Sequence, residues 1–506
     1  MRLSRAKQVF VLSVIPLLLL APQTQSCSAS DSGSGGGDGI GGNGAPGTGG
    51  NGVGPGMGGG QPYDGGGSPP NPAEVRVGLV QSAQASVTSI QQAEIDQMVA
   101  EAVNQAGGFD GLITDGMTVV LKPNLVGMYD YTGGPNWELG PQLAPEVNGT
   151  TTDYRVTKAV AALVRQYNPS GQILVMEGTG GPATTPEVFA ALNYTPQYIP
   201  EVNEFIAIED DPNVTQVPIE GGILTNQYPV NTRLLNANVL ISIGALKTHY
   251  QAVVTGGIKN VGIGATPAFL FNPELYQSTV VRLGMVDHTT INLHHWIHDY
   301  VKARPISFTV IDGLQGLENG PAASQEVGGV TNISQSQMNM RLILAGRDPV
   351  AVDTVEALIM GWDPLAVEYL RALNDSGVGM ADTANIRVVG NTRVDLVKRQ
   401  FAVPSDEFAY GGAPVTDVAP PPVTLLGAQA SGGVLNISLA EDPSGDLRKV
   451  EITLNGQRIE PTVTGNFATI SMDVSHMAPG PYELVVTGYD YFLNMASSAP
   501  TPLTLQ

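Results

Sequence analysis

Residues 239–264, with the sequence VLISIGALKTHYQAVVTGGIKNVGIG, contain the most informative group of reactive side chains in the chain. An apolar run leads to Lys247 and His249, and a Gly-Gly turn then presents Lys259 and Asn260. These cations are conspicuous because the chain has only 24 Lys and Arg residues against 46 Asp and Glu residues. Cations at a strand end beside a glycine turn are suited to bind a carboxylate or a phosphate. The pattern therefore predicts an anion site and leaves the reaction open.

A second segment carries the same kind of side chains. Lys122, Pro123 and Asn124 directly follow an apolar run, and proline fixes the backbone where the chain leaves the predicted strand. Ligands of open α/β sheets bind at the carboxyl ends of the strands, so we expect both segments to contribute to one crevice. The alternative is that each lysine is an ordinary surface charge. The predicted anion-binding residues are Lys122, Asn124, Lys247, Lys259 and Asn260.

Three residues are candidates for proton transfer beside these cations. His249 is suited to exchange protons near neutral pH. Asp312, at the end of a predicted strand, and Asp353, in a predicted helix, are carboxylates that would orient the lysines or act as a general base. A purely structural, buried role for Asp353 is an equal alternative.

A histidine-rich segment, DHTTINLHHWIHDY at 287–300, predicts a different chemistry. His294 and His298 are four residues apart and would share one face of a helix. Together with Asp287 they would form a ligand set for a divalent metal such as zinc. The competing interpretation is a helix with exposed histidines that packs its apolar residues inward.

The elements that must position these residues predict an α/β fold. Apolar runs at 75–80, 119–121, 173–176, 239–243, 308–311, 342–344 and 386–389 are mostly continuous, as in strands that are covered on both faces. Helical patterns at 157–167 and 349–360 lie between them, the second with Asp348 as N-cap and Pro349 at its first position. We therefore expect a largely parallel sheet flanked by helices over residues 74–409.

The last part of the chain changes character after a proline-rich linker at 410–422. Alternating apolar residues and an Asn455-Gly456 hairpin turn predict a small all-β sandwich over 423–506. Its segments DPSGDLRKVEITLNGQ and PGPYELVVTGYD resemble bacterial immunoglobulin-like modules.

The first 73 residues have the pattern of a signal peptide followed by a disordered tether. Positive residues followed by a short apolar run form a signal peptide over 1–27, and Cys27, the single cysteine, lies where bacterial lipoprotein signals are cut and lipidated. Half of the residues in 31–70 are glycine, so 28–73 is expected to be a disordered tether. We expect a lipid-anchored protein of the bacterial cell envelope, at the outer membrane or in the periplasm; a secreted protein is the alternative.

The large domain resembles the domain-of-unknown-function 362 family over roughly residues 75–395. The resemblance is carried by five blocks in order: VVLKPNLV (119–126), TDYRVTKAVAALV (152–164), VLISIGALKTH with TGGIKNVGIG (239–264), FTVIDGLQGLENGP (308–321) and LILAGRDPVAVDTVEALIMG (342–361). The family implies an α/β fold and offers no agreed reaction. Many relatives carry cysteine motifs for iron–sulfur clusters. This chain has one cysteine, so that redox role does not carry over.

The net charge of the chain limits the classes of binding partner that we expect. The net charge of −22 repels nucleic acid and anionic lipid headgroups, so a small anionic ligand is the expected partner and the membrane is reached only through the lipid anchor. We expect no iron–sulfur cluster, and a divalent metal only at the histidine segment. The sequence favours a cell-envelope protein acting on a small carboxylate or phosphate compound, without deciding that it is an enzyme. The alternatives are a non-catalytic binding or structural lipoprotein and a metal-dependent hydrolase.

Overall fold

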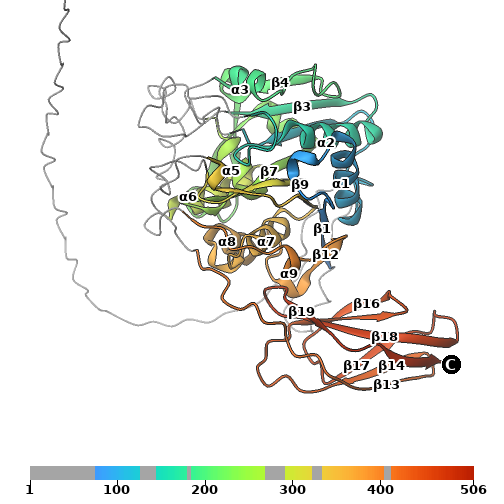
Figure 1. Cartoon of the computed structure of the whole chain (residues 1–506). Coiled ribbons are helices and arrows are strands. Elements are labelled where there is room, and N and C mark those ends of the chain that lie inside the picture. The colour runs from blue at the N-terminus through green and yellow to red at the C-terminus, as the bar shows by residue number, and fades with distance from the viewer. Residues whose placement is uncertain (1–73, 126–143, 179–183, 268–290, 322–332, 404–411) are drawn as a thin grey trace, which may run out of the picture. The chain divides into compact units, whose positions relative to one another are not determined.

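A mixed β-sheet organises the large domain of the computed structural model, which describes residues 74–125, 144–178, 184–267, 291–321, 333–403 and 412–506. The predicted lipidation residue Cys27, the tether and the predicted metal ligand Asp287 lie outside the described residues. Within the described part, eight strands form the main path of the sheet (Figure 1). In spatial order these are β12 (Ile386–Gly390), β1 (Val75–Gln81), β11 (Leu342–Gly346), β9 (Phe308–Leu317), β7 (Val239–His249), β2 (Thr118–Pro123), β3 (Gln172–Glu177) and β4 (Glu204–Ala207).

Most neighbouring strands in this sheet are parallel. The run from β9 through β7, β2 and β3 to β4 is parallel throughout, and β1 is parallel to β12. β11 is antiparallel to both of its neighbours, β1 and β9. The prediction of a largely parallel sheet in an α/β fold is confirmed, with β11 as the exception. Two short strands pair with central strands, β8 (Val253–Val254) with β7 and β10 (Gln337–Met338) with β9. β5 (Val214–Pro218) and β6 (Gln227–Asn231) form a separate antiparallel pair.

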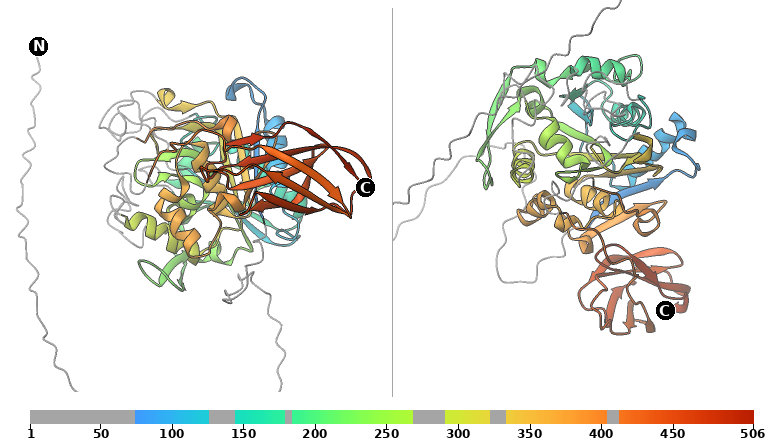
Figure 2. Two further views of the ribbon diagram at one scale, coloured as in Figure 1. Left: turned by 90° about the horizontal axis from the view of Figure 1, so that it is seen from below. Right: turned by 60° about the vertical axis from the view of Figure 1, so that its left-hand side comes forward.

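Helices cover both faces of the sheet (Figures 1 and 2). One core contains buried residues of α1 (Gln92–Gln105), α2 (Tyr154–Tyr167) and α3 (Thr185–Ala191). The other contains α4 (Thr232–Asn236), α5 (Gly256–Gly264), α6 (Asn292–Ala303), α7 (Pro349–Ile359), α8 (Glu368–Asp375) and α9 (Val394–Val397). Because the central strands have apolar side chains on both faces, each face must be covered, and two separate cores result.

Local sequence signals set several helix boundaries. The Asp348 side chain accepts hydrogen bonds from the N–H groups of Val350 and Ala351, and Pro349 occupies the first turn of α7, as predicted. Asp153 caps α2 in the same way through Arg155 N–H. In the described residues, no helix has both the length and the hydropathy that crossing a bilayer requires.

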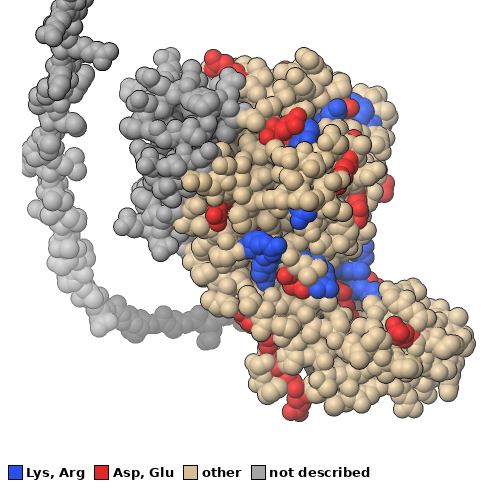
Figure 3. All heavy atoms as spheres, viewed as in Figure 1, with Lys and Arg blue, Asp and Glu red and all other residues tan. Residues whose placement is uncertain are grey.

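The C-terminal part is a sandwich of two antiparallel sheets around one apolar core. One sheet contains β13 (Leu425–Ser431), β14 (Val434–Leu439) and β17 (Thr469–Asp473); the other contains β15 (Lys449–Leu454), β16 (Gln457–Thr464), β18 (Gly480–Tyr489), β19 (Met495–Ser497) and β20 (Thr501–Leu505). Asn455 and Gly456 both have positive φ and form the tight turn between β15 and β16, so the predicted hairpin is confirmed. On the face seen in Figure 3, charged side chains are scattered among a majority of uncharged residues.

Candidate functional site

Lys122 lies at the centre of a buried polar cluster near the carboxyl ends of β2 and β3. Its Nζ atom forms an ion pair with Glu177 Oε1 at 2.8 Å, and both side chains are almost completely buried. The same Nζ donates to Asn260 Oδ1 at 3.0 Å, while Asn260 Nδ2 donates back to the Lys122 carbonyl at 2.9 Å. Residues from β2, β3 and α5, distant in sequence, therefore meet at one point.

Glycine makes room for this lysine. A Cβ atom at Gly264, the last residue of α5, would lie 2.7 Å from Lys122 Nζ. Glu177 also accepts hydrogen bonds from the N–H groups of Leu125 and Gly178, at 2.9 and 2.8 Å. The carboxylate thus fixes the chain as it leaves both strands, which orients the ammonium group.

Lys247 forms a second cluster at the end of β7. Its fully buried ammonium group donates to Asn124 Oδ1 at 3.2 Å, to the carbonyl of Thr150, and to the carbonyl of Pro321 at 3.5 Å. These three acceptors are neutral oxygens. Among the described residues, no carboxylate lies within ion-pair distance of this lysine, in contrast to Lys122.

The two clusters share one electrostatic environment. Burial lowers the pKa of Lys247 well below its usual value, and the charges of Lys259 and Lys122 lower it further. The carboxyl groups of Glu177 and Glu356 act in the opposite direction. The predicted lysines Lys122, Lys247 and Lys259 therefore come from three elements into mutual electrostatic range, at 0 %, 0 % and 8 % exposure.

The glycine turn before Lys259 differs from the prediction. Gly256 and Gly257 begin helix α5, and the N–H groups of Gly257 and Ile258 donate to the two Asp353 carboxylate oxygens at 2.8 and 3.0 Å. A carboxylate of the chain therefore already occupies these N–H groups at the start of the helix. Asp353 instead holds the helix that carries Lys259 and Asn260.

Gly256 is required at this point. Its φ is +53°, and a Cβ atom there would lie 2.3 Å from Asp353 Oδ2. Burial raises the pKa of Asp353 above its usual value. The structural alternative for Asp353 fits these contacts better than a role in which its carboxylate meets a ligand.

Glu356 was not predicted, although it is fully buried one helical turn after Asp353. Neither of its carboxyl oxygens has a hydrogen-bond partner with good geometry, and the nearby main-chain N–H groups of Gly256 and Lys247 offset its burial only in part. Burial, followed by the Asp353 charge, raises its pKa well above the usual value. The only sequence signal was a glutamate on the inward face of an apolar helix.

Asp312 lies beside the start of α2, the helix that covers the face of the sheet opposite to α5 and α7. It accepts hydrogen bonds from Asp153 N–H at 2.7 Å and Leu314 N–H at 3.0 Å. Burial raises its pKa, and the Asp153 charge adds to the effect. Thr152 Oγ1 links this network to the sheet, since it donates to the Ile243 carbonyl and accepts from Asn124 N–H. Asp312 therefore positions the segment whose Thr150 carbonyl contacts Lys247.

His249 ends β7, two residues beyond Lys247, and is 5 % exposed. Its Nδ1 atom accepts hydrogen bonds from the N–H groups of Gln251 and Ala252 at 3.1 and 3.2 Å. The Nδ1 atom is therefore the acceptor of a tight turn.

The two histidines of the predicted metal site have protein partners on both ring nitrogens. His294 Nε2 lies 3.2 Å from the Gln251 carbonyl and its Nδ1 accepts from Tyr369 N–H. His298 contacts Asp299 through Nδ1 and Ser376 through Nε2. Burial lowers the pKa of His294 to about 4. The ring nitrogens that a metal would need are thus engaged, and the described contacts are those of structural histidines and a hydrogen-bonded relay.

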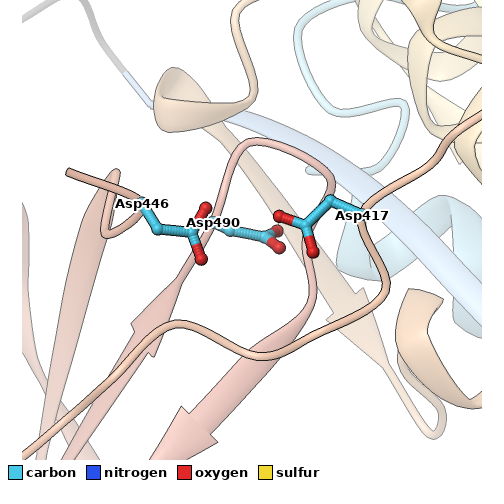
Figure 4. Close-up of side chains that lie close together, drawn as sticks. All are labelled: Asp417, Asp446 and Asp490. Carbon is cyan, nitrogen blue, oxygen red and sulfur yellow. The ribbon is translucent and has the colours of Figure 1, made fainter. Parts of the chain in front are cut away.

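Three carboxylates meet elsewhere, between the linker and the sandwich (Figure 4). Oxygens of Asp417, Asp446 and Asp490 lie within 4.8 Å of one another, a spacing that can hold a metal ion. Asn494 donates to Asp490 Oδ2 at 2.6 Å, and burial raises the Asp490 pKa to about 6.

A surface depression of about 510 Å³ lies away from the lysines. It is lined by α3 and the edge strand β4, including Phe189, Phe205 and the Glu204–Arg233 ion pair. None of the predicted anion-binding residues lines it.

Comparisons with known proteins give a family match and distant structural likenesses. No curated protein matches the sequence. Fibronectin(III)-like modules of Clostridium thermocellum CbhA align with 22 % identity over 17 % of this chain and 94 % of theirs, with a TM-score of 0.15. The lactate racemase apoprotein of Thermoanaerobacterium thermosaccharolyticum aligns with 13 % identity over 53 % of each chain, with a TM-score of 0.31. The aligned part thus spans about half of that protein, and at these scores neither likeness carries an argument about function.

The family match covers the lysine clusters. Lys122, Glu177, Lys247, Asp312 and Asp353 all lie inside the matched segment. Residues 119–357 match the model of the family described as "Domain of unknown function (DUF362)".

Proposed function

We propose that the large domain binds a small carboxylate or phosphate compound at the lysine clusters and exchanges a proton with it. The binding groups are the side chains of Lys122, Asn124, Lys247, Lys259 and Asn260. Lys259, at 8 % exposure, is the least buried of these side chains, and a ligand would approach from its side.

The observation that carries the proposal is the environment of Lys247. A fully buried ammonium group normally has a carboxylate partner, as Lys122 has Glu177. Lys247 has three neutral acceptors instead and two more lysines nearby. A bound anion would compensate this charge, and the gain would be large because the site is shielded from water.

The carboxyl groups near Lys247 do not balance its positive charge. Burial raises the pKa of both Asp353 and Glu356, which favours their neutral forms. Glu177 is already paired with Lys122. Among the described residues, Lys122 and Lys247 therefore share one nearby paired carboxylate, Glu177, inside an acidic protein.

Burial also prepares Lys247 for proton transfer. A lysine with a lowered pKa releases its proton more readily and, when neutral, serves as a general base. His249 Nε2 is the second candidate for this role. Asp312 and Asp353 support the site by holding the main chain around it.

The cellular part of the proposal rests on the N-terminal sequence alone. We propose that the chain is lipidated at Cys27 and tethered to the bacterial envelope by 28–73, which would place the domain outside the cytoplasm. Expression of Cys27→Ala in a bacterial host would release the protein from the membrane fraction; retention there would contradict the anchor.

The binding test compares two lysines. Sulfate, inorganic phosphate, acetate and a set of 2-hydroxy and 2-oxo acids are titrated into wild type and Lys247→Met by calorimetry. The control variant is Lys302→Met, whose ammonium group contacts the surface carbonyl of Gly221. We expect Lys247→Met to lose at least about tenfold in affinity and Lys302→Met to bind as wild type does. Equal affinity in all three proteins would refute the site.

A further inference from the structure

A second arrangement of reactive groups joins α6 to the end of α8 and contains none of the lysine-cluster residues. Ser376 Oγ lies 3.1 Å from His298 Nε2, and His298 Nδ1 lies 2.8 Å from Asp299 Oδ1. Ser376 is exposed at the end of α8, whereas His298 and Asp299 are buried at 2 % and 0 % exposure. This is the order of groups found in an activated serine: an accessible hydroxyl, a base and a buried carboxylate that orients the base.

Asp299 is held firmly in its ionised form. Its oxygens accept hydrogen bonds from the N–H groups of Ile223 and Leu224, both at 2.8 Å, and from the Tyr228 hydroxyl at 2.8 Å. These bonds and the His298 contact outweigh burial and lower the pKa of Asp299 to about 2. The loop of the β5–β6 hairpin thus fixes this carboxylate.

The charge of Asp299 determines the tautomer of His298. An ionised carboxylate only accepts hydrogen bonds, so His298 Nδ1 must carry a proton. In the neutral ring Nε2 then has a free lone pair. The Ser376 hydroxyl donates to the Leu373 carbonyl at 3.2 Å and, by rotation about its C–O bond, can donate to His298 Nε2 instead.

Apolar side chains are exposed on the segments that carry Ser376 and the partners of Asp299. Among the described residues, few large apolar side chains are exposed, and three of them lie on the segments that meet here: Ile223 (46 %), Leu224 (38 %) and Val378 (36 %). The first two are the residues whose N–H groups bind Asp299, and Val378 is two residues beyond Ser376. Exposed apolar groups beside a nucleophile favour an apolar acyl group.

We propose that Ser376 is an activated nucleophile that accepts an apolar acyl group from an ester. Ser376 Oγ attacks the carbonyl carbon while its proton passes to His298 Nε2. The bond from that carbon to the alkoxy oxygen then breaks, and the same proton goes to the leaving alcohol. The products are an O-acyl serine and a free alcohol, with no change of oxidation state.

The backbone around Ser376 sets the expected efficiency. The N–H groups of Ser376, Gly377 and Val378 are bound to the carbonyls of α8 residues Ala372, Asn374 and Leu373. These three groups are therefore not available to an oxyanion, and loss of one such donor typically costs about 10²–10³ in rate. We expect acylation of Ser376 to be measurable and turnover to be slow.

Covalent labelling tests the proposal on the full chain. The protein is treated with a fluorophosphonate and, separately, with p-nitrophenyl acetate and p-nitrophenyl octanoate, and the modified serines are quantified by peptide mass spectrometry. Ser170 is the internal control because it is exposed and its hydroxyl donates to Asp115, not to a histidine. We expect Ser376 to react at least about tenfold faster than Ser170, given the typical effect of a general base.

Two variants test whether Ser376 reacts because His298 activates it or only because it is exposed. His298→Gln should reduce the Ser376 rate to that of Ser170, and Leu224→Ser should lower the ratio of the octanoyl rate to the acetyl rate at Ser376. If His298→Gln does not fold, the ratio of the two serines in wild type decides. Equal rates at Ser376 and Ser170, or an unchanged Ser376 rate in folded His298→Gln, would overturn the proposal.

Discussion

Lys122 and Glu177 form a buried ion pair at 2.8 Å, although one residue is near the end of β2 and the other ends β3. The parallel pairing of these strands brings their carboxyl ends together, so the pair results directly from the topology. It gives the lysine site one charge that is balanced within the protein. Lys247, close by, has no carboxylate within ion-pair distance in the described part of the chain, and this difference leads to the first two predictions.

Glu177→Gln should lower the free energy of unfolding by about 3–5 kcal/mol, because the mutation leaves the buried Lys122 ammonium without its carboxylate. Urea denaturation measures this change. The control is Glu204→Gln, which breaks the exposed Arg233–Glu204 pair and should cost less than about 1 kcal/mol. Similar losses in the two variants would show that the buried pair has no special energetic weight.

Sulfate affinity should fall as the pH rises, because the anion binds the protonated form of Lys247. Burial lowers the pKa of this lysine, and a bound anion raises it again, so binding takes up a proton. Affinity should be constant at low pH and decrease by at most about tenfold per pH unit above the pKa of the free site. Sulfate is the suitable probe because its charge is constant over this range. In Lys247→Met, the part of the profile that depends on this lysine should disappear; an identical profile would assign the proton elsewhere.

Asp353→Ala should weaken sulfate binding as well as stability, because Asp353 holds the first turn of α5, which carries Lys259. Loss of a helix cap typically costs about 0.5–2 kcal/mol. Asp382→Ala is the matched control: it removes the side-chain cap at Ala384 N–H of the short 3-10 helix Thr383–Asn385, which carries none of the predicted site residues. Calorimetry should show weaker binding in the first variant alone. Equal binding in both would remove Asp353 from the site.

Gly256→Ala should be more destabilising than Gly111→Ala, as measured by thermal unfolding. Both glycines have positive φ, which costs an L-residue about 1–2 kcal/mol. At Gly111 nothing lies within 4 Å of the added Cβ, whereas at Gly256 the Asp353 carboxylate lies at 2.3 Å. A smaller loss at Gly256 would mean that α5 moves freely away from α7.

Asp490 should make stability depend on pH. Its pKa is raised to about 6 by burial, so the folded state binds this proton more tightly than the unfolded state does. The contribution of Asp490 to the free energy of unfolding should therefore fall as the pH rises from about 4 to about 6 and be level above that range. Solvent screening limits the effect to the order of 1–2 kcal/mol. Asp490→Asn should flatten this slope, while Asp473→Asn, at an exposed position, should not.

The sequence predicted the elements of the fold well where apolar runs are continuous. The helices at 154–167 and 349–359 and most central strands lie where expected. β7 extends to His249, six residues beyond the apolar run, because Lys247 and Thr248 pair with neighbouring strands despite their polarity. Polar residues conceal strand ends whose partners lie far away in the sequence.

The site was predictable only in outline. Spacing at strand ends identified Lys122 and Lys247, because topology brings such ends together. It did not identify Glu356, since a single glutamate on an apolar helix gives no local signal of what it faces. Nor did it show that Asp353 reaches the N–H group of Gly257, 96 residues away in the sequence. The serine relay was hidden for the same reason: Ser376 and His298 are 78 residues apart.

The position of β1 has a consequence for how the chain is made. This first strand lies between β11 and β12, which are the last two strands of the large sheet to be synthesised. Val77 pairs with Gly346 on one side and Val388 on the other, so its neighbours emerge from the ribosome long after it does. Contacts so distant in sequence slow folding. A nascent chain shortened before residue 342 would leave β1 without either partner and the sheet incomplete, and would therefore be a ready substrate for chaperones and proteases.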